Sequence, residues 1–298
     1  MHIFVTGATG FVGSAVIKEL VDAGHRVLGL ARSAEAAEAL SFNGVQVCRG
    51  SLEDPESLRK GAALADGVIH TAFIHDFTKF KESCETDRKV IETLGSELAG
   101  SKRPLIITSA IGILPPGQHA TENSMPYYGE GAHPRTASEE AADSVALKGV
   151  NVSVVRLPPS VHGEGDHGFV PMLIDFARRK GVSAYLDKGL NHWPAVHRLD
   201  AARLYRLVIE KGFSGARYHA VGEEGVPFIE IAEVIGRRLN VPVAAKTPAE
   251  AAGHFEWFAH FAAIDITASS QQTREVLGWE PAQPGLVADL YGNGYFKA

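Results

Sequence analysis

The sequence predicts an α/β fold, a doubly wound parallel sheet with a smaller C-terminal part, and three observations support this prediction. Short apolar runs typical of buried strands alternate with helical segments along the first half of the chain. The first of these strands leads through closely spaced glycines into a helix. The 298 residues, 45% of them hydrophobic, are enough for one large or two smaller well-packed domains.

Six apolar runs are expected to form the parallel sheet. They lie at residues 2–6, 26–33, 45–49, 67–73, 104–109 and 150–157. The segments between them include an amphipathic helix to about Ala23, an alanine-rich helix over 34–40 and a long helix ending near Ala99. Ligands in such sheets bind beyond the carboxyl ends of the strands, so the residues that follow each run are the candidates for a site.

Glycines at positions 7, 10 and 13 join the first strand to the first helix. A pyrophosphate needs close approach to backbone N–H groups, which a Cβ atom would obstruct, and the positive end of the helix dipole attracts it. Gly7 would make the turn, Gly10 would admit the phosphates and Gly13 would let the helix pack on the strand. This arrangement predicts dinucleotide binding; the alternative is a glycine-rich turn without a ligand.

The second strand ends at Arg32, followed by Ser33. An acidic residue at this strand end holds the ribose hydroxyls of NAD, whereas an arginine accommodates the 2′-phosphate of NADP. Because no carboxylate is present at this strand end, the sequence favours NADP over NAD. A solvated arginine without a ligand is the alternative.

The run Thr6-Gly7-x-x-Gly10-x-x-Gly13 resembles the extended short-chain dehydrogenase/reductase family, which contains sugar-nucleotide epimerases and dihydroflavonol-type reductases. The similarity continues at residues 156–166, where His162 stands in place of the usual tyrosine, and in the Leu-Gly-Trp-x-Pro turn at 277–281. The resemblance implies a Rossmann domain over residues 1–160, with returning segments at about 191–222. Residues 161–298 would supply the substrate side and the C-terminal segments.

The glycine turn and the resemblance together indicate a set of cofactor-binding residues along one edge of the sheet. Ser51 departs from the family pattern, which has an aspartate near the adenine at this position. The expected set is Gly7, Thr9, Gly10, Phe11, Val12, Gly13, Arg32, Ser33, Ser51, Leu52, Thr71, Ala72, Phe73, Thr108, Pro158 and Pro159.

The largest departure concerns the Tyr-x-x-x-Lys pair with which family members move a proton and hold the ribose. Arg135 falls in the tyrosine position and Glu139 in the lysine position, while the hydroxyl position falls on Ala110, one residue past Ser109. An arginine is never deprotonated at neutral pH, but it can stabilise a developing oxyanion. The alternative is that Arg135 and Glu139 form an i,i+4 ion pair without a catalytic role.

The proton must then come from another side chain. His75, after the fourth strand and next to Asp76, is our first candidate because imidazole titrates near neutral pH. The expected catalytic residues are His75, Ser109, Arg135 and His162. Tyr127 or Tyr128 could also reach the site from the loop 115–132.

Three functions are consistent with the sequence. The first is an atypical NADP-dependent oxidoreductase, an enzyme acting on a small carbonyl or alcohol substrate with a proton donor other than tyrosine. The second is an epimerase, dehydratase or isomerase of the same family; for a sugar nucleotide, however, Arg178, Arg179, Lys180 and Arg198 form only a scattered basic set. The third is a non-catalytic NADP-binding sensor or interaction protein, which the missing pair favours.

Charge and cysteine content limit the partners. With a net charge of -6, no basic surface is expected for nucleic acid or an anionic membrane, so the partner we expect is a small-molecule substrate. Cys48 and Cys84 are interpreted as reduced core thiols of a cytoplasmic protein, and no metal site is expected. The family resemblance implies a homodimer. The aromatic stretch 253–264 is expected to pack in the core, with a pocket wall or a dimer face as alternatives.

Overall fold

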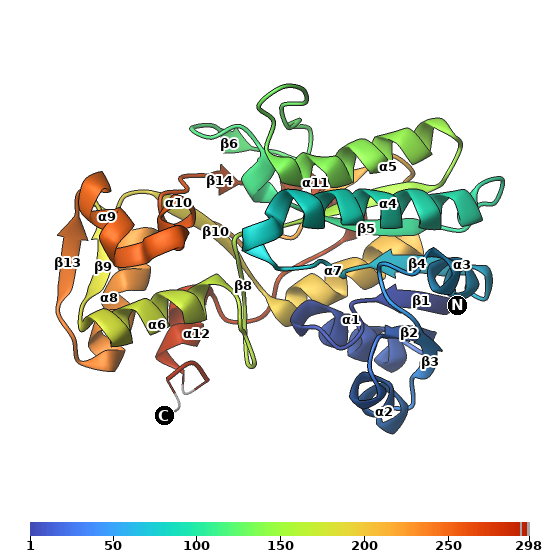
Figure 1. Ribbon diagram of the computed structural model, residues 1–298, viewed down its shortest axis with the longest axis horizontal. Helices are drawn as coiled ribbons and strands as arrows, with labels where there is room; N and C mark the ends of the chain where they lie inside the picture. Colours follow the sequence, from blue (N-terminus) through green and yellow to red (C-terminus); the bar gives the residue numbers. More distant parts are fainter. Residues whose placement is uncertain (293, 297–298) are drawn as a thin grey trace.

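A computed structural model describes residues 1–292 and 294–296, and its main feature is a seven-stranded parallel sheet (Figure 1). The strand order is β11-β7-β5-β4-β1-β2-β3. The strands are β1 (His2–Thr6), β2 (Arg26–Ala31), β3 (Gln46–Arg49), β4 (Gly67–His70), β5 (Leu105–Ala110), β7 (Val152–Leu157) and β11 (Arg217–His219). The chain runs outward from β1 to β3 and then returns to β4 on the other side of β1. The crevice between β1 and β4 is therefore the point at which such sheets bind ligands.

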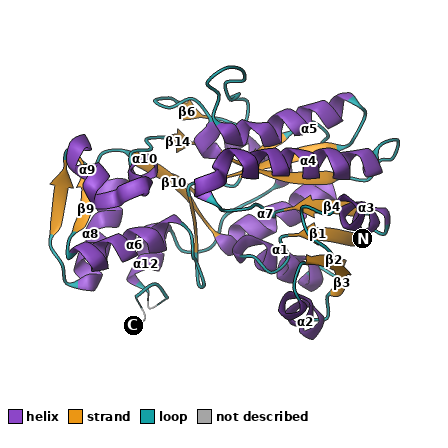
Figure 2. Cartoon of the chain, in the orientation of Figure 1, coloured by secondary structure: helices purple, strands orange, loops and turns teal. Residues whose placement is uncertain are grey.

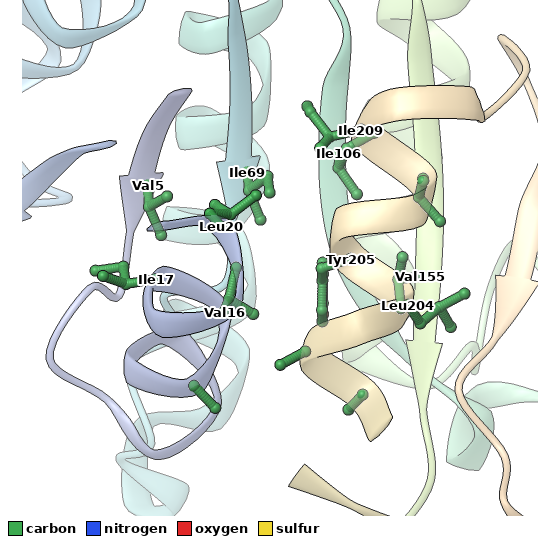
Figure 3. Packing of buried hydrophobic residues seen from close by; sticks show 14 of the residues in the cluster. Val5, Val16, Ile17, Leu20, Ile69, Ile106, Val155, Leu204, Tyr205 and Ile209 are labelled. Carbon is green, nitrogen blue, oxygen red and sulfur yellow. The ribbon is translucent and has the colours of Figure 1, made fainter. Parts of the chain in front are cut away.

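Helices cover both faces of this sheet. One face carries α1 (Phe11–Asp22), α2 (Ala34–Phe42) and α7 (Arg198–Lys211); the other carries α3 (Pro55–Ala63), α4 (Phe80–Leu98) and α5 (Ala137–Leu147). Figure 3 shows side chains of α1 and α7 packed against the strands of the first face. The predicted doubly wound parallel fold is confirmed.

The alternation of side chains along β1 explains why its sequence is apolar throughout. Ile3 and Val5 pack with α1 and α7, whereas Phe4 packs on the opposite face with α3. All three side chains are fully buried. A parallel strand covered on both faces needs apolar residues at every position, which is the pattern found in the sequence.

The smaller part lies beside the carboxyl edge of the large sheet and is built from short sheets and helices (Figures 1 and 2). Its strands are β12 (Glu223–Pro227), β10 (His192–His197) and β8 (Ser160–His162) in one sheet, with β13 (Val243–Lys246) and β9 (Ser183–Leu186) in another. Its helices are α6 (Phe169–Lys180), α8 (Phe228–Leu239), α9 (Pro248–Phe255), α10 (Ala259–Ala262) and α12 (Leu286–Tyr291). The 3-10 turn η4 (Glu256–Phe258) joins α9 to α10.

The segment expected to return to the large sheet is divided between the two parts. β10 joins the small three-stranded sheet, whereas α7 packs on the large sheet and β11 pairs with β7. Helix α11 (Gln271–Leu277) and the following turn pack near α7, where the Asp200 carboxylate accepts bonds from the backbone N–H groups of Ala282 and Gln283, both 3.0 Å. The division of the chain at about residue 160 into separate domains stays a prediction.

The remaining short elements connect these layers. They are η1 (Phe77–Lys79), η2 (Ile111–Ile113), η3 (Pro134–Thr136), β6 (His119–Ala120) and β14 (Thr267–Ala268). Over residues 1–292 and 294–296, none of the helices has the length and apolarity needed to cross a membrane.

Candidate active site at the carboxyl edge of the sheet

The turn between β1 and α1 has the backbone geometry that a pyrophosphate requires. Gly7 has a φ of +69°, and a Cβ atom there would lie 2.7 Å from the backbone nitrogen of Ala72. A Cβ at Gly13 would lie 2.0 Å from the Gly7 carbonyl oxygen, so the helix can approach the turn only if this residue is glycine. Among the described residues, no side chain caps the helix at Gly10. These residues therefore fit the diphosphate of a dinucleotide.

Two arginines lie where β2 and β3 end side by side. Arg32 is exposed just after β2, and Arg49, the last residue of β3, donates a hydrogen bond to the Ser33 carbonyl oxygen. The Ser33 hydroxyl caps α2 by accepting from the Ala36 N–H at 3.2 Å. Arg49 is a candidate that sequence reasoning missed; its signal was a basic residue at the end of the neighbouring parallel strand.

The other expected cofactor residues lie along the same edge, where several are held by internal hydrogen bonds. Thr71 donates to the Thr6 carbonyl at 2.8 Å beside the glycine turn. The Thr108 hydroxyl donates to the His70 carbonyl at 2.8 Å and lies 2.6 Å from the Tyr205 hydroxyl. The remaining expected residues lie in the loops after β1, β3, β4 and β7 or in the first turn of α1: Thr9, Phe11, Val12, Ser51, Leu52, Ala72, Phe73, Pro158 and Pro159.

Arg135 takes part in a buried ion pair, but not with Glu139. Its guanidinium donates to Asp87 Oδ2 at 2.6 Å and to the Thr108 carbonyl at 3.0 Å, and it also contacts the Ser138 hydroxyl. Arg135 is 8% exposed and Asp87 is 2% exposed. The i,i+4 ion pair considered from the sequence is therefore wrong, because Arg135 belongs to a network with α4.

This network continues to β1. Asp87 Oδ1 lies 2.9 Å from His70 Nε2, and His70 Nδ1 lies 2.6 Å from the Thr6 hydroxyl. If Nε2 donates to Asp87, Nδ1 accepts from Thr6 and both ring nitrogens are satisfied. Burial opposes ionisation of Asp87, but the charge of Arg135, with further contributions from His70 and Ser138, holds the pKa of Asp87 well below its usual value. The carboxylate is thus charged and holds Arg135 in place.

Glu139 has entirely different partners. Both of its carboxylate oxygens accept from Arg156 at 2.8 Å, and Oε2 also accepts from Arg217 Nε at 3.0 Å. Burial opposes its ionisation, but hydrogen bonds from Arg156, with further contributions from Ser109 and Arg217, hold the pKa of Glu139 below its usual value. Both residues in the Tyr-x-x-x-Lys positions are therefore tied into the protein interior.

His75 lies at the centre of the residues that face the crevice. Its ring centroid is 5.2 Å from that of Phe73, whose face carries the Arg135 guanidinium at 4.2 Å. His75 is exposed, yet the surrounding protein partly desolvates the imidazole. This desolvation, followed by the charges of Arg135 and His167, lowers the pKa of His75 below its usual value. The imidazole is therefore predominantly neutral at pH 7.

Asp76 does not support His75 as expected from the sequence. Its Oδ1 caps η1 by accepting from the Thr78 N–H at 3.0 Å and from the Thr78 hydroxyl at 2.6 Å. A carboxylate two residues before a threonine at the start of a helical turn bonds locally, which competes with any bond to its neighbour.

The other proton-donor candidates are not brought to the crevice. His162 is buried, with Nδ1 2.9 Å from Asp289 Oδ2. Ser109 is buried beside Glu139. The Tyr128 hydroxyl donates to Asp143 Oδ2 at 3.5 Å; burial, followed by the charges of Glu139 and Asp143, raises the pKa of Tyr128 to about 12. The structure thus brings together His75 and Arg135 of the four expected catalytic residues.

Three further residues at the crevice were not singled out as site residues from the sequence. Arg198 carries its guanidinium 4.9 Å from the centre of the Phe11 ring, directly after the glycine turn, and donates to the Glu164 carbonyl at 2.7 Å. His167 packs edge-on against the same Phe11 ring at 5.7 Å. His133 precedes Arg135, whose N–H it accepts, and packs on Phe80. Their proximity depends on contacts between distant segments, which no local sequence pattern indicates.

Comparisons with known proteins identify the family of the chain. Residues 3–221 match the model of the NAD dependent epimerase/dehydratase family. An uncharacterized protein of Schizosaccharomyces pombe is 49% identical over 298 residues, covering 99% of this chain and 100% of its own length. A ketoreductase of Stigmatella aurantiaca, named for a 4-hydroxy-2-methyl-3-oxo-4-farnesyl-3,4-dihydroquinoline-1-oxide, is 28% identical over 232 residues, covering 73% of this chain and 67% of its own.

Solved structures show the same fold. The dTDP-glucose 4,6-dehydratase DesIV of Streptomyces venezuelae, determined with bound NAD, superposes with a TM-score of 0.78 and 18% identity. The match covers 98% of this chain and 96% of that one. It extends over both the large sheet and the smaller part.

Proposed function

Because this chain belongs to the NAD-dependent epimerase/dehydratase family, we propose that it is an NADP-dependent oxidoreductase that acts on a small carbonyl or alcohol substrate. The observation that carries the proposal is the position of His75. It is solvent-accessible beside Phe73, at the edge where the glycine turn fits a dinucleotide. Arg135, in the position of the usual tyrosine, is instead fixed by Asp87.

We assign the hydride to the cofactor and the proton to His75. A bound nicotinamide supplies the hydride that goes to the carbonyl carbon. In its protonated form, His75 donates a proton to the carbonyl oxygen and is left neutral, so that hydride and proton together give the alcohol. In the reverse direction the neutral imidazole accepts the hydroxyl proton. Arg135 holds Phe73 through its contact with the ring face and keeps a positive charge near the reacting oxygen.

The preference for NADP rests on the charge at the ends of β2 and β3. Arg49 is the last residue of β3 and Arg32 directly follows the neighbouring parallel strand β2, whose Ala31 is paired with Arg49 in the register. Two cations at this position favour the doubly charged 2′-phosphate. Glu35, at the start of α2, opposes this preference; its own backbone N–H, a hydrogen bond from Ser33 and the charge of Arg49 lower its pKa.

A specific observation favours a second candidate, a non-catalytic NADP-binding protein. Arg135 and Glu139 both lie in buried ion-pair networks, which is how residues with a structural role behave. The two candidates differ in turnover but not in cofactor binding.

The test is a titration of the purified protein with NADPH and NADH, followed by a panel of aldehydes, ketones and enones. We expect tighter binding of NADPH and its oxidation by at least one carbonyl compound. Binding without oxidation on any panel member would favour the non-catalytic candidate. Failure to bind either cofactor would contradict both.

A further inference from the structure

Four aromatic side chains from distant segments meet beside His75. These are Phe77 in η1, Phe169 at the start of α6, Trp257 in η4 and Phe261 in α10, which we call the aromatic cluster. The Phe77 ring lies 5.1 Å from Trp257 and 5.4 Å from Phe261, measured between ring centroids. Phe77 lies directly before α4 of the larger part and the other three residues belong to the smaller part (Figure 1), so the cluster joins the two parts.

The cluster is anchored in the core on one side and open to solvent on the other. Phe169 and Phe261 pack against the fully buried Phe258 at 5.1 Å and 5.5 Å. Trp257, however, is 51% exposed, and Phe77 is only half-buried. The aromatic stretch 253–264 was expected to pack in the core, but only part of it does so, since one of its faces reaches Phe77. Large aromatic rings that stay accessible beside polar groups are typical of ligand sites.

The geometry of the cluster defines the shape of its ligand. The planes of Phe77 and Trp257 are inclined by only 28°, so their faces are nearly parallel. The Phe77 ring centroid is 6.3 Å from that of His75. Because the two rings stack directly on each other here, a flat group inserts between them only if the exposed Trp257 moves outward. The inserted group would place a carbonyl attached to it next to the imidazole. Stacking between aromatic faces favours a planar ring over a puckered one.

Charge argues against an anionic ligand at this position. Arg179 lines a pocket together with Trp257, and Arg179 and its neighbour Lys180 are both paired with Glu256, at 3.2 Å and 3.1 Å. Arg179 also binds Asp175 at 2.8 Å. Arg198 is held on Phe11 at the glycine turn and donates to the Glu164 carbonyl. Cations already paired with carboxylates offer little to a phosphate group of the substrate.

We propose that the aromatic cluster is the substrate-binding wall and that it takes an uncharged carbonyl compound with a planar aromatic or conjugated group. The ring enters between Phe77 and Trp257, and the carbonyl oxygen faces His75. This inference rests on the proposed oxidoreductase function and adds to it the chemical class of the substrate.

Binding can be separated from turnover with a product pair of equal carbon number. Benzyl alcohol and cyclohexylmethanol differ in having a flat or a puckered ring, and neither reacts with the protein loaded with NADPH, because both components are already reduced. Calorimetric titration should show benzyl alcohol binding about five- to tenfold more tightly. Phe77→Leu and Trp257→Leu should remove this preference, whereas Phe42→Leu, at an exposed site on α2, should keep it.

The corresponding aldehydes then test turnover. Benzaldehyde should be reduced with a higher kcat/KM than cyclohexanecarbaldehyde, and the NADPH affinity of the Phe77 and Trp257 variants should match that of the unmodified protein. Equal affinities for the two alcohols, or no binding of either, would overturn the proposed substrate wall. Preferential binding of benzyl alcohol without reduction of any aldehyde would instead contradict the oxidoreductase function and leave the aromatic site standing.

Discussion

The glycine turn and the segment from η3 into α5 lie at the same edge of the sheet, but they differ in how much of the family pattern they keep. The turn keeps the backbone features of the family, with a positive φ at Gly7 and no room for a side chain at Gly13. The segment from η3 into α5 holds the two residues at the expected positions of the catalytic pair, but Arg135 and Glu139 are bound to Asp87 and Arg156. From this comparison we propose that the turn binds the cofactor while this segment has a structural role. Proton transfer is then assigned to a residue outside this segment, His75.

The largest effect is expected from breaking the network of α5. Arg135→Ala leaves the Asp87 carboxylate buried without its cation, which should lower the free energy of unfolding by about 3–5 kcal/mol. Urea denaturation measures this loss. Arg179→Ala, which removes exposed pairs with Asp175 and Glu256, should cost far less, because solvent screens exposed charges. If the two variants were equally stable, the helix would not have the structural role assigned to it.

The double variant Arg135→Met, Asp87→Leu sharpens this test. Replacing a buried ion pair by apolar residues is often nearly neutral, so part of the lost stability should return. The variant also removes the hydrogen bond between Asp87 and His70, so the free energy of unfolding should recover only in part.

Adding a side chain in the glycine turn should weaken cofactor binding. In Gly13→Ala the new methyl group would collide with the Gly7 carbonyl, so we expect NADPH affinity to fall at least about tenfold. Fluorescence titration of NADPH provides the measurement. Gly253→Ala, on α9 with no atom within 4 Å of the added Cβ, is the matched control and should bind as the unmodified protein does. An unchanged affinity for Gly13→Ala would mean that the turn does not hold the phosphates.

A smaller effect is expected at the ends of β2 and β3. Arg32→Asp should weaken NADPH binding by about tenfold and leave NADH binding nearly unchanged, because only NADPH carries the 2′-phosphate. Arg59→Asp, an exposed position on α3, makes the same change in net charge and controls for long-range electrostatics. Equal losses for both cofactors in Arg32→Asp would remove the basis for NADP preference.

The sequence predicted those parts of the molecule that depend on local backbone geometry. Strands β1 to β5 and the Gly7, Gly10 and Gly13 turn follow from apolar runs and glycine spacing, and the structure contains them. The partners of Arg135 and Glu139 could not be predicted, because Asp87 and Arg156 become neighbours only when α4 and β7 pack beside α5. The role of Asp76 was misassigned although a local signal existed, namely the threonine two residues later that it caps.

The pH dependence of NADPH-linked carbonyl reduction tests the central claim, that His75 supplies the proton, most directly. Because the pKa of His75 is lowered below 6.5, the protonated imidazole is a minority at pH 7, and kcat for reduction should rise as the pH falls toward that pKa. Oxidation of the alcohol needs the neutral imidazole. Its kcat should therefore stay constant near neutral pH and fall in acid. In His75→Gln both dependences should disappear and turnover should drop, with NADPH affinity unchanged. A His75→Gln variant that kept the same rate and pH profile would contradict the account.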